Sequence, residues 1–165
     1  MRNALVRLTL GIAVVFIVWN QRAAVVAADA IQQPNKSAAA QVQYFPAVDV
    51  NKAFASNATL VDGKDRNYSI IAGKRDKAGE VEVHATNTDV IYITGGSATF
   101  VTGGRVIEPR TTAPGETRGR EIEGGNSHQL SKGDVIVVPA GVPHWFKAVQ
   151  PPLNDFIVKV RQENR

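Results

Sequence analysis

The segment Gly133-Asp-Val-Ile-Val-Val-Pro139-Ala-Gly141-Val-Pro-His144-Trp-Phe decides the fold of this chain. Its run of four β-branched apolar residues is bounded by turn residues on both sides, a pattern that predicts a short strand at 135–138. Proline and glycine then form a tight turn that fixes the direction of the next strand, predicted at 144–149. The segment therefore predicts a strand, a turn and a second strand that begins with a histidine.

Further short strands, separated by glycine-containing turns, are expected on both sides of this segment. We predict them at 68–72, 80–86, 89–94, 97–102, 127–130 and 156–160, with Gly95-Gly96 and Gly103-Gly104 closing the third and fourth of the set. Short strands at such regular spacing are typical of a β-sandwich or a β-barrel.

Two segments depart from this pattern of strands. A short helix is expected before the first strand, N-capped by Asp49 and continuing through Phe54 and Ala55 to the turn at 62–64. Residues 105–127 contain several prolines and glycines with scattered Arg and Glu, so they are expected to form a long loop. A loop of that length in a compact domain is usually functional or disordered.

The opening segment resembles the second sequence motif of the cupins, a family of small β-barrels. That motif, G-x5-P-x-G-x2-H-x3-N, is matched by Gly133, Pro139, Gly141 and His144, whereas Ala148 stands where the family has Asn. The resemblance covers about residues 66–160. It implies an all-β fold, a single cupin-type β-barrel (double-stranded β-helix or jelly roll) with a short N-terminal helix.

The first cupin motif, G-x5-H-x-H-x3–4-E-x6-G, is matched less completely. Aligned on its last glycine, Gly96, it places Asp89 at the family's Glu, His84 at its second His and Glu82 at its first His. An alternative register makes His84 the first ligand and Thr86 the second, but it needs a one-residue deletion and supplies fewer donors. The resemblance in the preferred register implies a metal site formed by His84, His144, Glu82 and Asp89.

The spacing of these residues is chemically reasonable without the family. Glu82 and His84 are two residues apart, so on a strand both side chains lie on the same face. A closed barrel can bring His144 next to them near its mouth, where small barrels hold ligands. Two imidazoles with one or two carboxylates suit a divalent metal ion, Fe, Mn, Ni or Zn, with open positions for a substrate. The alternative is that the carboxylates are solvated and that the barrel binds no metal.

Four other residues are candidates for the pocket. His128 is a fourth donor, a proton shuttle or a core histidine bonded to a backbone carbonyl. Phe146 is expected to line the cavity, whereas Trp145, next to it, packs on the outside of the sheet. Arg118 and Arg120 would bind a carboxylate or phosphate if their loop folds across the barrel mouth. Otherwise they belong to a solvated charged loop.

The N-terminal residues predict export. Arg2 and Arg7 precede an apolar run at 8–19, and small residues follow at 28–30, the pattern of a secretory signal peptide at 1–30. The run is shorter than the roughly 20 residues that a membrane-spanning helix needs, although an uncleaved anchor is the alternative. We expect a flexible lead-in at 31–45, a barrel domain at 46–165, and a periplasmic or secreted protein without a stable membrane span after cleavage.

Composition excludes several classes of protein. The 165 residues are enough for one domain, and 44% hydrophobic with 21% charged residues is a globular composition. The absence of cysteine excludes disulfides, cysteine zinc sites, thiol nucleophiles and Fe–S clusters. Removing residues 1–30 leaves 16 Lys and Arg against 14 Asp and Glu, and no basic cluster is interleaved with aromatics, so nucleic-acid binding is not expected.

The sequence thus predicts an exported single-domain cupin that binds a divalent metal ion and a small oxygenated ligand in the barrel cavity. Its reaction would be of the oxygenase, isomerase or lyase type. The alternative is a non-catalytic barrel that binds a small ligand or a partner without metal. We also expect a homodimer, formed through apolar outward residues around Trp145.

Overall fold

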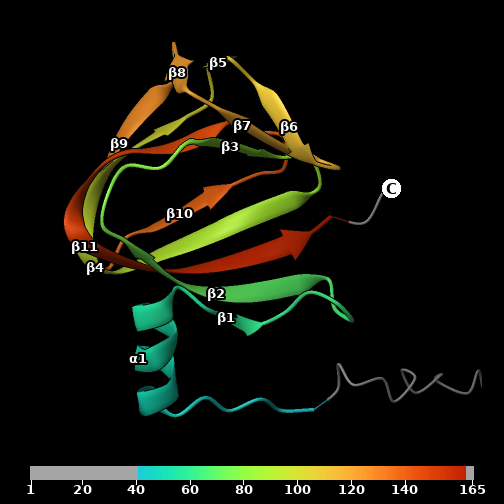
Figure 1. Ribbon diagram of the computed structural model, residues 1–165, viewed down its shortest axis with the longest axis vertical. Coiled ribbons are helices and arrows are strands. Elements are labelled where there is room, and N and C mark those ends of the chain that lie inside the picture. The colour runs from blue at the N-terminus through green and yellow to red at the C-terminus, as the bar shows by residue number, and fades with distance from the viewer. Residues whose placement is uncertain (1–40, 163–165) are drawn as a thin grey trace, which may run out of the picture. The chain divides into compact units, whose positions relative to one another are not determined.

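The computed structural model describes residues 41–162 (Figure 1). The predicted signal peptide and most of the predicted lead-in lie outside these residues. The elements are α1 (Ala47–Ser56), β1 (Thr59–Val61), β2 (Tyr68–Arg75), β3 (Val81–His84), β4 (Asn87–Thr102), β5 (Arg105–Ile107), β6 (Arg110–Ala113), β7 (Glu116–Gly119), β8 (Glu121–Glu123), β9 (Asn126–Ser131), β10 (Val135–Val138) and β11 (His144–Arg161).

The two longest strands, β4 and β11, organise the barrel. They pair antiparallel along most of their length, with 144–150 of β11 opposite 97–102 of β4, and 154–161 opposite 87–95. Next to the paired segments 144–150 and 97–102 lie β3 and β9, and β7 and β6 extend this sheet beyond β3. Next to the paired segments 154–161 and 87–95 lie β2 and β10, and β1 lies beyond β2. Each long strand therefore passes from one face of the barrel to the other (Figure 1).

The corners of these strands differ from the prediction. Gly95-Gly96 does not end a strand, and the segments predicted as 144–149 and 156–160 are one strand, β11. Gly96 has a φ of +78°, and a Cβ there would lie 2.5 Å from the carbonyl oxygen of Pro152. Glycine adopts this left-handed conformation without steric cost and lets a paired strand bend at an irregularity. The four strands predicted at 89–94, 97–102, 144–149 and 156–160 are therefore two bent strands, β4 and β11.

The core lies between the two faces and is formed mainly by alternating residues of β4 and β11. Its buried members are Ile91, Ile93, Ala98, Phe100, Leu130, Val138, Phe146, Leu153 and Ile157. The alternation is that of strands with one face toward the interior. The predicted all-β barrel with one short N-terminal helix is confirmed.

The segment 105–127 is not a loop, contrary to the prediction. β5 pairs with β8 in a small separate sheet, while β6 and β7 form a hairpin. β7 continues the main sheet by pairing with β3, so that Glu116 lies opposite His84 and Arg118 opposite Glu82. Most of the prolines and glycines occupy the turns between these very short strands, and Gly119 ends β7; together they conceal the strands' period of two.

The helix also begins earlier than predicted. α1 starts at Ala47, and Pro46 rather than Asp49 is its N-cap; the carbonyl of Pro46 accepts the N–H groups of Asp49 and Val50. The helix is attached to the outer side of the barrel by Phe54, whose ring centroid lies 4.8 Å from that of Phe156. Within residues 41–162, no helix has the length and apolarity that crossing a membrane requires.

Candidate functional site

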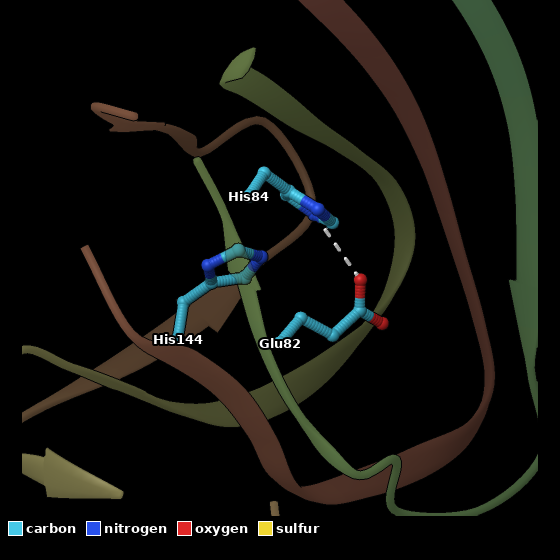
Figure 2. A group of neighbouring side chains, drawn as sticks. All are labelled: Glu82, His84 and His144. Atoms are coloured by element: carbon cyan, nitrogen blue, oxygen red, sulfur yellow. Dashed lines mark ion pairs between the residues drawn. The ribbon is translucent and has the colours of Figure 1, made fainter. Parts of the chain in front are cut away.

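Strands β3, β4 and β11 bring the four predicted metal-site residues together. Glu82 and His84 are two residues apart on β3, so their side chains share one face of the strand. His144, the first residue of β11, is the register partner of Glu82. One donor atom from each of these three side chains lies within 4.8 Å of the other two (Figure 2). Asp89 of β4 completes the group, with its Oδ2 3.4 Å from Nε2 of His84 and 3.7 Å from Nε2 of His144.

The two imidazoles are buried and oriented. His84 and His144 are 3% and 4% exposed, and their ring centroids are 5.1 Å apart. Nδ1 of His84 lies 2.6 Å from the carboxylate of Glu116, and Nδ1 of His144 lies 3.1 Å from the carbonyl oxygen of Val142. When both Nδ1 atoms donate, each Nε2 keeps a lone pair directed toward Asp89. This is the arrangement in which a carboxylate or a carbonyl orients a metal-binding histidine.

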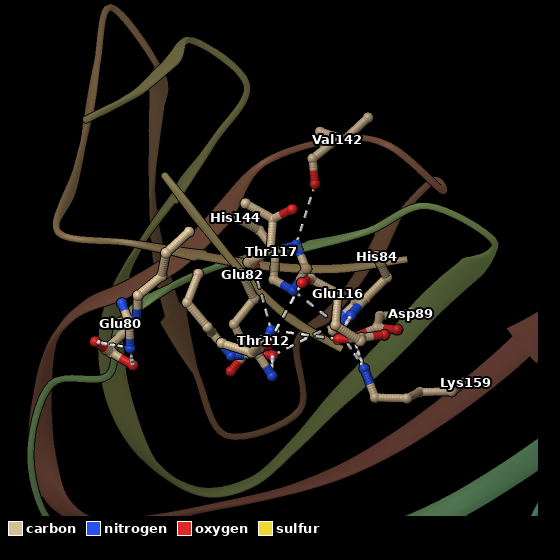
Figure 3. Close-up of polar contacts among 12 residues, drawn as sticks. Glu80, Glu82, His84, Asp89, Thr112, Glu116, Thr117, Val142, His144 and Lys159 are labelled. Carbon is tan, nitrogen blue, oxygen red and sulfur yellow. Dashed lines mark hydrogen bonds and ion pairs between the residues drawn. The ribbon is translucent and has the colours of Figure 1, made fainter. Parts of the chain in front are cut away.

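A lysine ammonium lies among these donors. Nζ of Lys159, on β11, is 2.8 Å from Nε2 of His84 and 2.7 Å from Oδ2 of Asp89 (Figure 3). Lys159 is the register partner of Asp89, so the pairing of β4 with β11 produces this contact. A cation therefore already lies at the point toward which His84 and Asp89 are directed.

The electrostatics of the cluster favour one further positive charge. Burial lowers the pKa of His84, but the nearby carboxylates of Asp89 and Glu82 outweigh burial and raise it to about 9. In the neutral imidazole Nδ1–H donates to Glu116 and Nε2 accepts from Lys159, whereas in the cation Nε2–H faces Asp89 and Glu82. Burial likewise raises the pKa of Glu82, yet His84 and Arg118 bring it down to about 2.

The pKa values of the remaining two members of the cluster, His144 and Asp89, are both lowered, which leaves the imidazole neutral and the carboxylate charged. Burial lowers the pKa of His144, which keeps this imidazole neutral and its Nε2 available as a ligand atom. Burial raises the pKa of Asp89, but His84 and Lys159 outweigh it, so the pKa of Asp89 is lowered and its carboxylate is ionised.

The donor set fits a divalent metal ion. The carboxylates of Glu82, Asp89 and Glu116 and the guanidinium of Arg118 sum to a charge of −2 when Lys159 is set aside. Oδ1 of Asp89 is buried and has no hydrogen-bond partner within residues 41–162. A buried oxygen without a partner is costly. A cavity beside the cluster, lined in part by Glu82, Asp89 and His144 but not by His84, leaves about 10 Å³ for the centre of a water molecule, space for one water or ion.

The predicted pocket residues lie in different places. Arg118 borders the cluster, with one guanidinium nitrogen 3.6 Å from Glu82 and another 3.3 Å from Glu116. Phe146 is buried, lines the same cavity, and packs against Phe100 with ring centroids 4.6 Å apart. Trp145 is half-buried, and its Nε1–H donates to the carbonyl of Gly79 at 2.8 Å.

Two candidates lie outside the cluster. His128 is half-buried, and its Nε2 lies 3.0 Å from the hydroxyl of Thr102; among residues 41–162 it is neither a donor of the cluster nor bonded to a backbone carbonyl. Arg120 is exposed and pairs with Glu108 and Glu121 at 3.1 Å each. Its side chain therefore does not reach the cavity.

Sequence analysis missed Lys159 and Glu116. Lys159 follows Asp155 and Ile157 at intervals of two, a signal that it lies on the inward face of its strand. Glu116 and Arg118 show the same spacing within a segment that was expected to be a loop. In both cases the partner residue is distant in the chain, so the spacing alone did not indicate a contact.

An ion pair lies deeper in the barrel. Asp155 is completely buried, and its Oδ2 lies 3.1 Å from Nε of Arg75. The guanidinium of Arg75 lies 4.1 Å from the ring centroid of Phe146. Burial raises the pKa of Asp155, although Arg75 opposes this shift.

Comparisons with known proteins agree with this fold. A Bacillus halodurans protein of known structure superposes with a TM-score of 0.50 at 10% identity, over 76% of this chain and 86% of that protein. A cupin protein of Bacteroides fragilis gives a TM-score of 0.45 at 11% identity, over 76% and 89% of the two chains. No curated protein sequence matches this chain significantly.

A third similar structure is a Streptomyces protein solved with uridine, described as a nucleoside dehydratase, with a TM-score of 0.41 and 8% identity. The match covers 60% of this chain and 63% of that one, so this chain spans less than two thirds of its length. The sequence signature of the family described as Cupin matches residues 74–164, more than half of the chain. The chain therefore belongs to the cupin family.

Proposed function

We propose that this cupin domain binds a divalent metal ion between His84, His144 and Glu82, with Asp89 as a further ligand. One observation carries the proposal: the Nε2 atoms of the two buried imidazoles lie 3.4 and 3.7 Å from the same oxygen, Oδ2 of Asp89, while Glu116 and the Val142 carbonyl contact their Nδ1 atoms. The charge of the surrounding side chains supports a divalent rather than a monovalent ion. Fe, Mn, Ni and Zn all suit such nitrogen and oxygen ligands.

The residues around the ion would then have distinct roles. A bound metal would supply a Lewis acid that polarises an oxygen atom of a small oxygenated ligand. Glu116 would orient His84 by accepting its Nδ1–H, so that Nε2 becomes a ligand atom once Lys159 has moved away. Arg118, which is 26% exposed at the edge of the cluster, would bind a negatively charged oxygen of the same ligand. The reaction class we propose is oxygenation, isomerisation or elimination of a lyase type.

Metal analysis of purified variants tests this function. We expect the wild-type protein to hold one metal ion per chain, and His84→Ala and His144→Ala each to lose it while staying folded, because the apolar strands of the barrel supply most of the folding energy. His128→Ala is the matched control and should keep the ion, since His128 contacts Thr102 outside the cluster. Metal content unchanged in both His84→Ala and His144→Ala would refute the proposed ligand set.

A second candidate is a barrel that binds a small ligand without metal, with the ammonium of Lys159 as its permanent cation. The distances of 2.8 Å to His84 and 2.7 Å to Asp89 favour it. In this case the wild-type protein contains no stoichiometric metal, and divalent ions do not raise its melting temperature. Thermal unfolding with and without Zn²⁺ or Mn²⁺ separates the two candidates, because an ion that binds only the native state stabilises it.

We also propose that the protein is exported and that residues 1–30 are removed. The basic residues, the short apolar run and the small-residue exit at the N-terminus support this proposal. N-terminal sequencing of the protein recovered from its producing cells would find a chain that begins after Ala28 or Ala30. A chain that still begins at Met1 would refute cleavage.

A further inference from the structure

A second pocket, of about 310 Å³, lies at the end of the barrel where β11 ends. Among the residues that the structure describes, its lining contains four basic side chains and no acidic one. The four basic residues are Lys64, Arg66, Lys159 and Arg161. A pocket of this size is at the lower end of the range that holds small molecules.

The fold places these residues side by side by strand register. Lys159 lies opposite Ser69 of β2, and Arg161 lies opposite Asn87 of β4. The backbone N–H of Arg161 donates to the carbonyl of Asn67 at 2.6 Å, which fastens the end of β11 to the segment that precedes β2. Lys159 and Arg161 are two residues apart on one strand and share a face. The pocket therefore continues the inward face that carries the donor cluster.

Two of the basic side chains are available to a ligand. Lys159 is committed to Asp89 at 2.7 Å. Lys64 and Arg161 are exposed, and within residues 41–162 neither side chain makes an ion pair or a hydrogen bond. Asn67, Asn87 and Ser69 add uncharged donors around them. An ammonium and a forked guanidinium next to neutral donors are the groups that recognise oxyanions.

We propose that this pocket binds the phosphate or carboxylate group of a small anionic molecule, with Arg161 and Lys64 as its main contacts. The site is distinct from the metal site proposed above and does not require a bound metal. Lys159 borders both, since it lines the pocket and its ammonium contacts His84 and Asp89. An anion held here would therefore lie directly beside the donor cluster.

Calorimetric titration of the full chain tests the proposal with two dianions of similar size, inorganic phosphate and malonate, at constant ionic strength. We expect saturable binding of at least one anion, with a dissociation constant at or below about 1 mM. The anion that binds more tightly identifies the group. Arg161→Gln and Lys64→Gln should each weaken binding about fivefold, the upper range for a partly exposed ion pair.

Lys132→Gln is the matched control, because it removes the same charge from the turn between β9 and β10, outside this pocket. Lys64→Gln lies in an exposed turn and keeps the test valid if Arg161→Gln fails to fold. The proposal is overturned if neither anion binds saturably at about 10 mM. It is also overturned if Lys132→Gln weakens binding as much as the two pocket variants, since the effect is then general screening. The titrations use protein freed of metal with a chelator, so a failure of the metal proposal stays distinguishable from a failure of this one.

Discussion

Replacing Lys159 by methionine tests whether the ammonium holds the place of a metal ion. Methionine keeps an unbranched apolar stem but removes the charge, so packing changes little. In the metal-free protein, Asp89 is only 2% exposed and loses its shortest contact. A hydrogen bond to a charged group is worth about 1.5–3 kcal/mol, so the metal-free variant should be destabilised by about that amount.

The same change should tighten metal binding. In the wild-type protein a metal ion must first displace Lys159 from His84 and Asp89, and in Lys159→Met this cost of about 1.5–3 kcal/mol is absent. Since 1.4 kcal/mol is a factor of ten, the dissociation constant for Zn²⁺ should fall about ten- to a hundredfold. Calorimetric titration of both proteins at the same pH measures this ratio.

The control variant is Lys52→Met, which removes one charge from an exposed side chain of α1 that pairs with Asp49 at 3.6 Å. Lys52→Met should leave the affinity for Zn²⁺ unchanged, because α1 carries no residue of the site and surface charges are screened. Equal affinities in wild type and Lys159→Met would refute the reasoning that the ammonium competes with the metal. Loss of metal binding in Lys159→Met would mean that Lys159 supports the site instead.

Three further predictions follow from the contacts of the barrel. The pKa of His84 is raised from 6.5 to about 9, so protonation of His84 contributes about 3 kcal/mol to the free energy of unfolding. This contribution is complete below pH 6.5 and is lost as the pH rises to 9. Urea unfolding should detect the loss of stability between these pH values, and in His84→Gln most of this pH dependence should be absent. Gly73→Ala should cost about 2–4 kcal/mol, because its Cβ would lie 2.0 Å from Oδ1 of Asp155; Gly63→Ala, whose nearest atom is 3.5 Å away, should be nearly neutral in the same assay. The homodimer stays a prediction, now through the exposed apolar Tyr92, Val135 and Val137; light scattering should find two chains per particle and one for Val137→Lys, and a single-chain wild type would contradict it.

Much of the fold could be predicted because it depends on patterns within a few residues. The strand at 135–138 has the predicted bounds, since four β-branched residues between two turns have few alternatives. The shared face of Glu82 and His84 followed from the period of two in a strand. The place of His144 at the start of β11 followed from the turn before it.

The rest of the site depends on register between distant strands, which leaves no local signal. Lys159 is 75 residues from His84, and Glu116 is 32 residues from it. Gly96 presents a similar difficulty, because a glycine between two apolar runs looks the same whether the chain turns back or bends while remaining paired. Only the pairing of β4 with β11 distinguishes these cases.

Lys159 also explains why the donor residues alone do not decide between a metal ion and an ammonium. Glu82, Asp89, Glu116 and Arg118 together carry a charge of −2. Two arrangements neutralise it: the ammonium of Lys159 with a proton on His84, or one divalent ion with Lys159 withdrawn and both imidazoles neutral. Lys159 also lines the basic pocket beside Arg161. An oxyanion in that pocket would attract the ammonium outward and so favour the second arrangement. The two proposed sites would then be coupled through one side chain. The coupling would be reciprocal, because a bound metal ion would raise the affinity for the oxyanion by the same factor.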